Sequence, residues 1–487
     1  MATSGSDFIG TKSRSAAMLP KAHPERHHYD PRVVAAVARA ILLFAAFGLP
    51  AMAQDSIPAD RSQDRVQQTV TPPTSTSDLP LSQGAPVTMP PAAFDFSPEL
   101  KEGRDALAQR GFTFNINLTV DAGYNLTGGA RAGGFVAGLL DAAVQFDFQR
   151  MGLVDGGLLL ARWQSYYETN PGPLDLVPDY WGWEGLASGL GDVNQLSELY
   201  WEQKLFDDAL TMIFGKQDAL NWFLNPIGPA GYFLSNIDTA PATMAPWVPT
   251  YPNQAMGLVA IIQPNEWMTG KFGWFDGTNL YSENGSPLVS TGSLGPGTFF
   301  DNPGSWFFIS ELDFAWKLES GLDGLLGIGG WVQTGPSAVS GNGTPEVVAP
   351  TQPNGGWYAQ VTQRVWDPAP NDLDESGMRV FGQIGWGDPS INPVNWSLAG
   401  GFIIDGPLPG RPDDDFGMGV GYAWFSDPAL VYPAEPGLHE MNFEIFYAIA
   451  VTDYLTIEPD LQFVASPGEF GQQPMAVAGF VRFSINF

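Results

Sequence analysis

The sequence has no cysteine and almost no histidine, and each shortage excludes a class of chemistry. Without cysteine the chain cannot form a disulfide, use a thiolate nucleophile or bind a metal through sulfur. Three of the four histidines, His23, His27 and His28, lie in the first thirty residues, and the fourth is His439. We therefore expect no cofactor and no metal site, and a single imidazole that could act as a catalytic base.

Charge is also scarce, and basic charge is the scarcest. Charged residues make up 15% of the chain, and 22 Lys and Arg stand against 52 Asp and Glu. The formal net charge of −30 repels nucleic acids and other polyanions. We expect no nucleic-acid partner.

Aromatic residues and glycine, in contrast, are abundant. The chain has 16 Trp, 32 Phe and 57 Gly, and its mean hydropathy is −0.06. A soluble domain carries more charge than this, and a helical membrane protein is far more hydrophobic. Intermediate hydropathy with many aromatic residues is typical of a membrane β-barrel, whose strands alternate apolar and polar residues.

The N-terminal segment predicts export. Basic residues precede an apolar run at 40–49, which is followed by the small residues Ala51 and Ala53. The run is too short to cross a bilayer but is typical of a cleaved signal, so we assign residues 1–53 to a signal peptide with an N-terminal extension. The alternative is a buried N-terminal helix of a cytosolic protein.

Two short segments follow before the barrel begins. Residues 54–96 are rich in Pro, Ser, Thr and Gln and predict a disordered periplasmic linker, because such a composition cannot bury a core. Residues 97–110 predict a short periplasmic helix, with Ser97 as N-cap and Gly111 as the stop.

From Phe112 the pattern has a period of two. In residues 112–121 apolar and polar side chains alternate without exception over the length of one tilted transmembrane strand. Similar runs recur to the end of the chain, near 112–121, 138–149, 157–167, 197–206, 209–217, 256–263, 269–276, 306–317, 323–333, 355–366, 377–386, 395–404, 415–425, 438–451, 454–464 and 474–487. The fold predicted for 111–487 is therefore all-β, a 16-stranded antiparallel transmembrane β-barrel.

The connections between these runs support the same fold. Several even-numbered connections are short, whereas the odd-numbered ones are usually long and include 218–255. Short periplasmic turns and long extracellular loops are typical of bacterial outer-membrane barrels. A soluble sandwich would need two domains and would expose its polar faces.

The period of two also assigns side chains to the lumen, because Arg or Lys facing lipid at mid-depth costs roughly 2–4 kcal/mol. The predicted pore-lining residues on strands are Arg162, Glu198, Glu202, Lys204, Arg364, Trp366, Arg379, Glu444, Glu458 and Arg482. Guanidinium donors and carboxylate acceptors suit the hydroxyls of neutral polyols. The alternative is that these charges pair with one another and only stiffen the wall.

Loop 218–255 is long, aromatic and almost uncharged. Folded inward, it would form the constriction, with a stacking track for sugar rings made by Trp222, Phe223, Tyr232, Phe233 and Trp247. The alternative is an outward lid. A second feature, the acidic run 413–415, is interpreted as a solvated turn rather than a calcium site.

Two segments carry a resemblance to a known family. Residues 128–157 and 197–218, the second reading SELYWEQKLFDDALTMIFGKQD, together with the terminal Phe487, resemble the carbohydrate-selective porins of the OprB type. The resemblance implies a sixteen-stranded channel of the outer membrane for passive uptake of sugars. It also implies neutral sugars, outer-membrane lipid and the barrel assembly machinery as partners, and it leaves open whether the barrel is a monomer or a homotrimer.

Three other function classes are compatible with parts of the sequence. The acidic excess favours a non-selective or cation-preferring porin as the main alternative. A barrel enzyme would need an activated nucleophile, and His439 is its one possible imidazole base. A soluble sugar-binding β-protein is contradicted by the apolar outward faces. We expect a channel and not an enzyme.

Overall fold

The computed structural model describes residues 98–487, apart from 188–191, 225–232, 278–298, 301–304, 319, 335–336, 342–343, 349–352, 369–376, 393, 427–438, 453, 469–472 and 487. The predicted signal peptide, the predicted linker and Phe487 lie outside the described residues.

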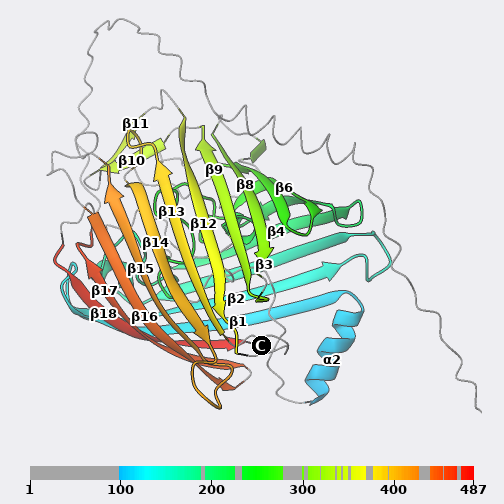
Figure 1. The fold of residues 1–487 in the computed structure, drawn as a ribbon, viewed down its shortest axis with the longest axis horizontal. Helices are drawn as coiled ribbons and strands as arrows, with labels where there is room; N and C mark the ends of the chain where they lie inside the picture. Colours follow the sequence, from blue (N-terminus) through cyan, green and yellow to red (C-terminus); the bar gives the residue numbers. More distant parts are fainter. Residues whose placement is uncertain are drawn as a thin grey trace, which may run out of the picture. The chain divides into compact units, whose positions relative to one another are not determined.

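The described residues form a closed barrel of sixteen antiparallel strands, as predicted (Figure 1). The strands are β1 (Phe112–Thr127), β2 (Gly133–Asp147), β3 (Gly157–Glu168), β4 (Val193–Leu205), β5 (Leu210–Gln217), β6 (Ala255–Asn265), β7 (Met268–Asp276), β8 (Trp306–Lys317), β9 (Asp323–Gln333), β12 (Asn354–Trp366), β13 (Gly377–Gly387), β14 (Val394–Asp405), β15 (Asp415–Phe425), β16 (His439–Thr452), β17 (Leu455–Ala465) and β18 (Ala476–Asn486). Each of the sixteen predicted runs overlaps one of them. Strands β1 and β18 pair and close the sheet, which leaves no free edge.

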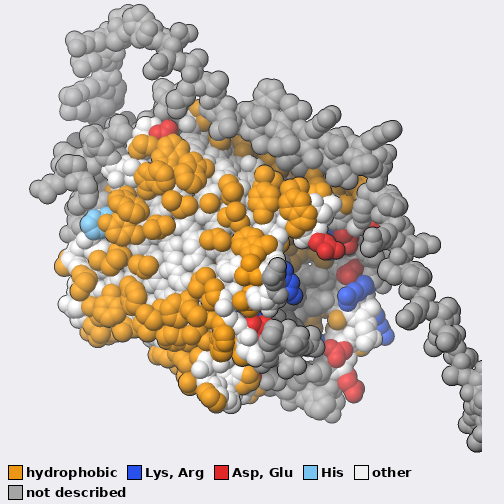
Figure 2. Space-filling view, in the orientation of Figure 1, with side chains coloured by type: hydrophobic (Ala, Val, Ile, Leu, Met, Phe, Trp, Pro, Cys, Tyr) orange, Lys and Arg blue, Asp and Glu red, His pale blue; other side chains and the backbone are white. Residues whose placement is uncertain are grey.

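The alternation of the sequence becomes the two faces of the wall. On β1, Ile116 and Tyr124 point outward and are 37% and 51% exposed, whereas Asp121 and Asn125 point inward and are buried. Figure 2 shows apolar side chains spread over the outer face. The apolar set of each strand therefore forms the outside of the barrel, as a membrane-embedded wall requires.

The connections separate onto two rims. One rim, here called the short-turn rim, carries 148–156, 206–209, 266–267 and 318–322. The other, the long-loop rim, carries 169–192, 218–254, 277–305 and 334–353. In the turn at 206–209 the residues Phe206, Asp207 and Asp208 all have positive φ, between 53° and 68°, which lets the chain reverse within four residues.

Outside the wall, helix α2 (Pro98–Gln109) occupies the segment where a helix was expected. Its Arg104 guanidinium lies 5.5 Å from the ring centroid of Phe114 on β1, a cation–π contact. No helix among the described residues is both long enough and apolar enough to cross a membrane.

Three short elements in the long loops were not predicted. They are α3 (Pro173–Leu176), the 3₁₀ turn η1 (Ala219–Asn221) and the hairpin β10 (Ser337–Gly341) with β11 (Thr344–Val348).

Candidate functional site

The interior of the barrel is the candidate site, and loop 218–254 folds into it. The Glu444 carboxylate on β16 accepts hydrogen bonds from the backbone N–H groups of Leu234 and Ser235, at 2.6 and 3.1 Å. The Gln383 side chain on β13 donates to the Ile237 carbonyl at 2.7 Å. Of the two alternatives for this loop, the structure has the inward one.

A second loop enters the lumen, and the sequence analysis missed it. The Glu440 carboxylate on β16 accepts from the Tyr180 N–H at 2.7 Å and from the Trp181 N–H at 3.3 Å. The Gln462 side chain donates to the Trp183 carbonyl at 2.7 Å. The available signal was the aromatic run at 180–183, which resembles that of the first loop.

The two loops are hydrogen-bonded to each other. The Gly185 N–H donates to the Leu234 carbonyl at 2.7 Å, and the Asn236 N–H donates to the Trp181 carbonyl at 2.8 Å. The Tyr251 hydroxyl donates to the Leu186 carbonyl at 3.2 Å. We call residues 178–187, 218–224 and 233–254 the inner loop layer. It narrows the lumen on the side of the long-loop rim.

The predicted stacking track is wrong for most of its aromatic residues. Phe223, Phe233 and Trp247 are almost fully buried. The Phe233 ring, for example, packs edge-on against Phe381 and Phe446 of the wall at 5.4 and 5.1 Å. These rings anchor the loop to the barrel and cannot meet a solute. Tyr232 lies outside the described residues.

Trp222 is the member of the track that is only partly buried. Its ring lies 5.7 Å from that of Tyr200 on β4. It stands beside η1, whose N-cap Asp218 accepts from the Leu220 N–H. Trp222 is therefore packed against Tyr200, with part of its side chain left exposed.

Several of the predicted lumen charges are buried in ion pairs. The Arg162 guanidinium on β3 contacts Asp141 on β2, and its Nη1 lies 2.9 Å from Oε1 of Glu198 on β4. Glu198 also accepts from the Asn221 side chain at 2.7 Å. These residues face inward as expected, but their partners are wall and loop groups.

Arg482 on β18 is a second case. Its Nη2 lies 2.7 Å from Asp121 on β1 and 3.7 Å from Glu184 of the inner loop layer. Glu458 stands opposite Arg482 in the β17–β18 register, and its Oε1 has no hydrogen-bond partner among the described residues.

A further group of charges lies toward the short-turn rim. Lys204 Nζ is 4.0 Å from Glu202 Oε1, with 46% of the lysine side chain exposed. Arg364 Nη1 is 3.7 Å from Asp367 Oδ2. Arg364 and Arg379 are direct partners in the β12–β13 register, so two guanidinium groups share one patch of the inner wall.

Trp366 departs from the inward placement that alternation predicts. The register of β12 against β13 shifts between Arg364 and Trp366, and the Trp366 side chain is 50% exposed, like the outward residue Val365. A bulge adds one residue to a strand, so each side chain after the bulge points to the face opposite the one that alternation predicts.

Three carboxyl groups of the inner loop layer have raised pKa values. Burial raises the pKa of Asp179 to about 7, although the Trp183 N–H donates to it. Burial and the nearby Glu198 raise the pKa of Asp218 to about 7. Burial, together with Asp121, raises the pKa of Glu184 well above its ordinary value. The packing of this layer therefore depends on protonation.

The acidic run 413–415 is not a fully solvated turn. Asp414 is buried and accepts from the Arg411 guanidinium at 2.5 and 2.8 Å and from the Tyr447 hydroxyl at 2.8 Å. Within the described ranges no cluster of three or more His, Asp or Glu side chains is arranged to hold a metal ion.

Comparison with known proteins places the chain among porins. The model of the family described as "Carbohydrate-selective porin, OprB family" matches residues 99–487. Porin B of Pseudomonas aeruginosa is 25% identical over 151 residues, which are 27% of this chain and 32% of that protein. The chain thus matches about a third of the length of this relative.

A solved structure shares the fold. The high-pH structure of Pseudomonas putida OprB superposes with a TM-score of 0.63 at 20% identity, covering 80% of this chain and 97% of the other. The low-pH structure of the same protein gives a TM-score of 0.48 at 16% identity, covering 83% and 99%.

Proposed function

We propose that this chain, which belongs to the carbohydrate-selective porin family OprB, lets carbohydrates diffuse passively across the bacterial outer membrane into the periplasm. The family implies the outer-membrane location. The observation that carries the proposal is a closed barrel whose lumen is narrowed by two inward loops, one of which carries Trp222, and is lined toward the short-turn rim by Glu202, Lys204, Arg364 and Arg379.

The chemistry of this lining fits neutral polyols. Arg364 and Arg379 donate hydrogen bonds to hydroxyls, Glu202 accepts them, and Trp222 offers an aromatic face to a sugar ring. Each contact has to be weak because a solute must leave as readily as it enters. A millimolar affinity, about −4 kcal/mol, is the scale we expect.

The buried charges have a different role. Glu440 and Glu444 accept backbone hydrogen bonds from the two inward loops, and Arg162 with Glu198 fixes the loop at Asn221. We infer that they set the width of the passage by holding the inner loop layer and do not bind solute themselves.

One observation favours a second candidate, a cation-preferring porin. The inner face of β14 to β17 carries Asp405, Asp415, Glu440, Glu444, Glu458 and Asp460. The base nearest to them in strand order beyond β17 is Arg482, which already pairs with Asp121. A barrel enzyme has less support, because the family and the fold point to a channel.

Liposome swelling tests the proposal. Vesicles that contain the purified protein should swell in isosmotic solutions of a neutral monosaccharide or disaccharide, and more slowly as the solute grows. Vesicles containing the heat-denatured protein are the control. Swelling with small salts but not with sugars would reject the carbohydrate channel in favour of the cation-preferring porin.

A further inference from the structure

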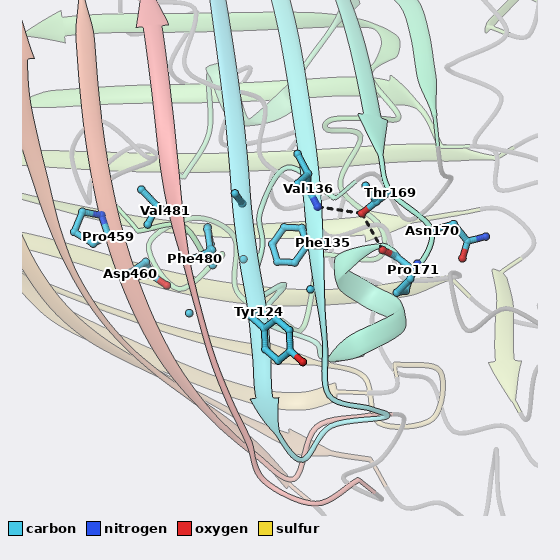
Figure 3. Close-up of a pocket in the computed structure, with 14 residues that line it drawn as sticks. Tyr124, Phe135, Val136, Thr169, Asn170, Pro171, Pro459, Asp460, Phe480 and Val481 are labelled. Atoms are coloured by element: carbon cyan, nitrogen blue, oxygen red, sulfur yellow. Dashed lines mark hydrogen bonds between the residues drawn. The ribbon is translucent and has the colours of Figure 1, made fainter.

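The outer wall has a groove of about 770 Å³ near the long-loop rim (Figure 3). Residues from β17, β18, β1 and β2 line it, and residues 169–171 border it beside Val136 of β2. Its outward-facing walls are formed by Ala122, Tyr124, Gly134, Val136, Gly479 and Val481.

The sheet register explains why the wall is hollow here. Tyr124 stands between Gly134 on β2 and Gly479 on β18, which have no side chains. Its ring lies over Gly134, where a Cβ would be 3.1 Å from the ring Cδ2, and no side chain fills the position at Gly479. The next outward residue on β1 is Ala122, between Val136 and Val481. Tyr124 and Val136 are 51% and 48% exposed.

The groove opens away from the lumen. Phe135 and Phe480, the inward neighbours of its floor, are each 4% exposed and pack edge-on against Trp183 inside the barrel, at 5.3 and 5.7 Å. These rings seal the floor. The groove is thus continuous with the apolar outer wall, which in a porin faces lipid.

We propose that this groove binds one acyl chain of a lipid from the leaflet on the long-loop side. Water finds few hydrogen-bond partners in an apolar groove, whereas a flexible hydrocarbon chain can fill an irregular apolar space. Tyr124 and Asn170 contribute a hydroxyl and an amide to the lining, and these are the groups that can meet the ester or head group. The proposal rests on the barrel lying in a membrane and not on which solute it carries.

A second copy related by a two-fold axis fits the groove less well. A two-fold contact places the same patch of both copies face to face, so that groove meets groove and the space stays unfilled. The lipid chain is the occupant that removes the void.

Photolabelling tests the proposal on the full chain. The protein is reconstituted into phosphatidylethanolamine vesicles that contain a trace of the same lipid with a diazirine on its acyl chain, and mass spectrometry locates the labels. We expect several-fold more label around residues 122–136 and 479–481 than on the outward residues of β13 and β14. Ala122→Leu and, independently, Val481→Trp should remove this excess by filling the groove.

Gly138→Leu is the matched control. Gly138 also faces outward on β2, and a Cβ there would meet nothing closer than 3.6 Å, so the label should be unchanged. Even labelling around the barrel, or an excess that persists in both folded filling variants, overturns the proposal. A third result would also overturn it. If the native protein is an oligomer in which the groove is not labelled, and Ala122→Leu dissociates that oligomer, then a second copy of the chain occupies the groove.

Discussion

At the scale of single residues, the partners of a lumen charge decide its role, and its face alone does not. Arg162 and Arg364 both point inward, yet only Arg162 is enclosed by two carboxylates on neighbouring strands. The first joins three neighbouring strands, and the second pairs at 3.7 Å with Asp367, three residues further along the chain.

Arg162→Ala should therefore destabilise the barrel by about 3–5 kcal/mol, because it leaves Asp141 and Glu198 buried without their partner. Urea unfolding of the detergent-solubilised protein, followed by loss of heat-modifiable migration, measures this. Arg150→Ala is the control, since 60% of that side chain is exposed on a turn, and it should change the stability by no more than about 0.5 kcal/mol. Equal midpoints for both variants would contradict the assignment.

Arg364→Ala combined with Arg379→Ala should weaken sugar block of the ion current by roughly tenfold, the loss of about 1–2 kcal/mol of hydrogen bonding. Sugar titration of single-channel current measures the effect, and selectivity should shift toward cations. Arg131→Ala, on the long-loop rim, serves as the control and should leave block intact. Unchanged block in the double variant would mean that these arginines only support the wall.

The inward placement of most of these side chains could be predicted from sequence, but their pairing could not. Alternation decides the face, so Arg162, Glu198 and Arg482 were placed inward. Their partners depend on register: Asp121 is 361 residues from Arg482 in the chain. Trp366 was misplaced because one bulge reverses the alternation, and no residue type in that run predicts a bulge.

At the scale of elements, strands were predictable and loop paths were not. A strand carries its own signal in a period of two, and a short turn fixes the next strand beside it. Whether a long loop folds inward depends on groups elsewhere in the chain. Here Glu440, Glu444 and Gln383 supply the hydrogen-bond partners that the loop backbone needs once it leaves water.

Glu444→Gln should loosen the loop that contains Leu234 and Ser235, because a neutral amide is a weaker acceptor and only one of its two terminal atoms can accept from an N–H group. We expect noisier single-channel currents and faster cleavage of the loop by added protease. Glu266→Gln, in an exposed turn on the short-turn rim, is the control. If the variant shows the same current noise and the same rate of protease cleavage as the unmodified protein, Glu444 does not hold the loop.

The inner loop layer should pack more firmly in acid than in base. The buried carboxyls of Asp179 and Asp218 have pKa values raised from 3.8 to about 7. Between these two pH values the carboxyls are protonated when the loop is packed and ionised when it is released. Packing is then strongest below about pH 4, weakens as the pH rises from 4 to 7, and changes little above that. Current noise should be higher at pH 8 than at pH 5. The reverse order would refute this linkage, and Asp179→Asn should reduce the change.

At the scale of the whole molecule, the ends of the barrel sequence meet and close the channel wall. Strands β1 and β18 pair over most of their length, and the ion pair of Asp121 with Arg482 lies on this seam. The closed wall has an apolar outside and a polar inside, so the lumen, narrowed by two loops, is the one route that the architecture provides for a hydrophilic solute.

Single-channel recording in a planar lipid bilayer, with a neutral sugar titrated into the bath and a salt gradient across the membrane, tests this account most directly. The account predicts stepwise conductance that does not depend on an energy source and that sugar blocks reversibly with a millimolar half-point, about −4 kcal/mol. Conductance steps that sugar does not affect, with a reversal potential near that of an ideal cation channel, would contradict it.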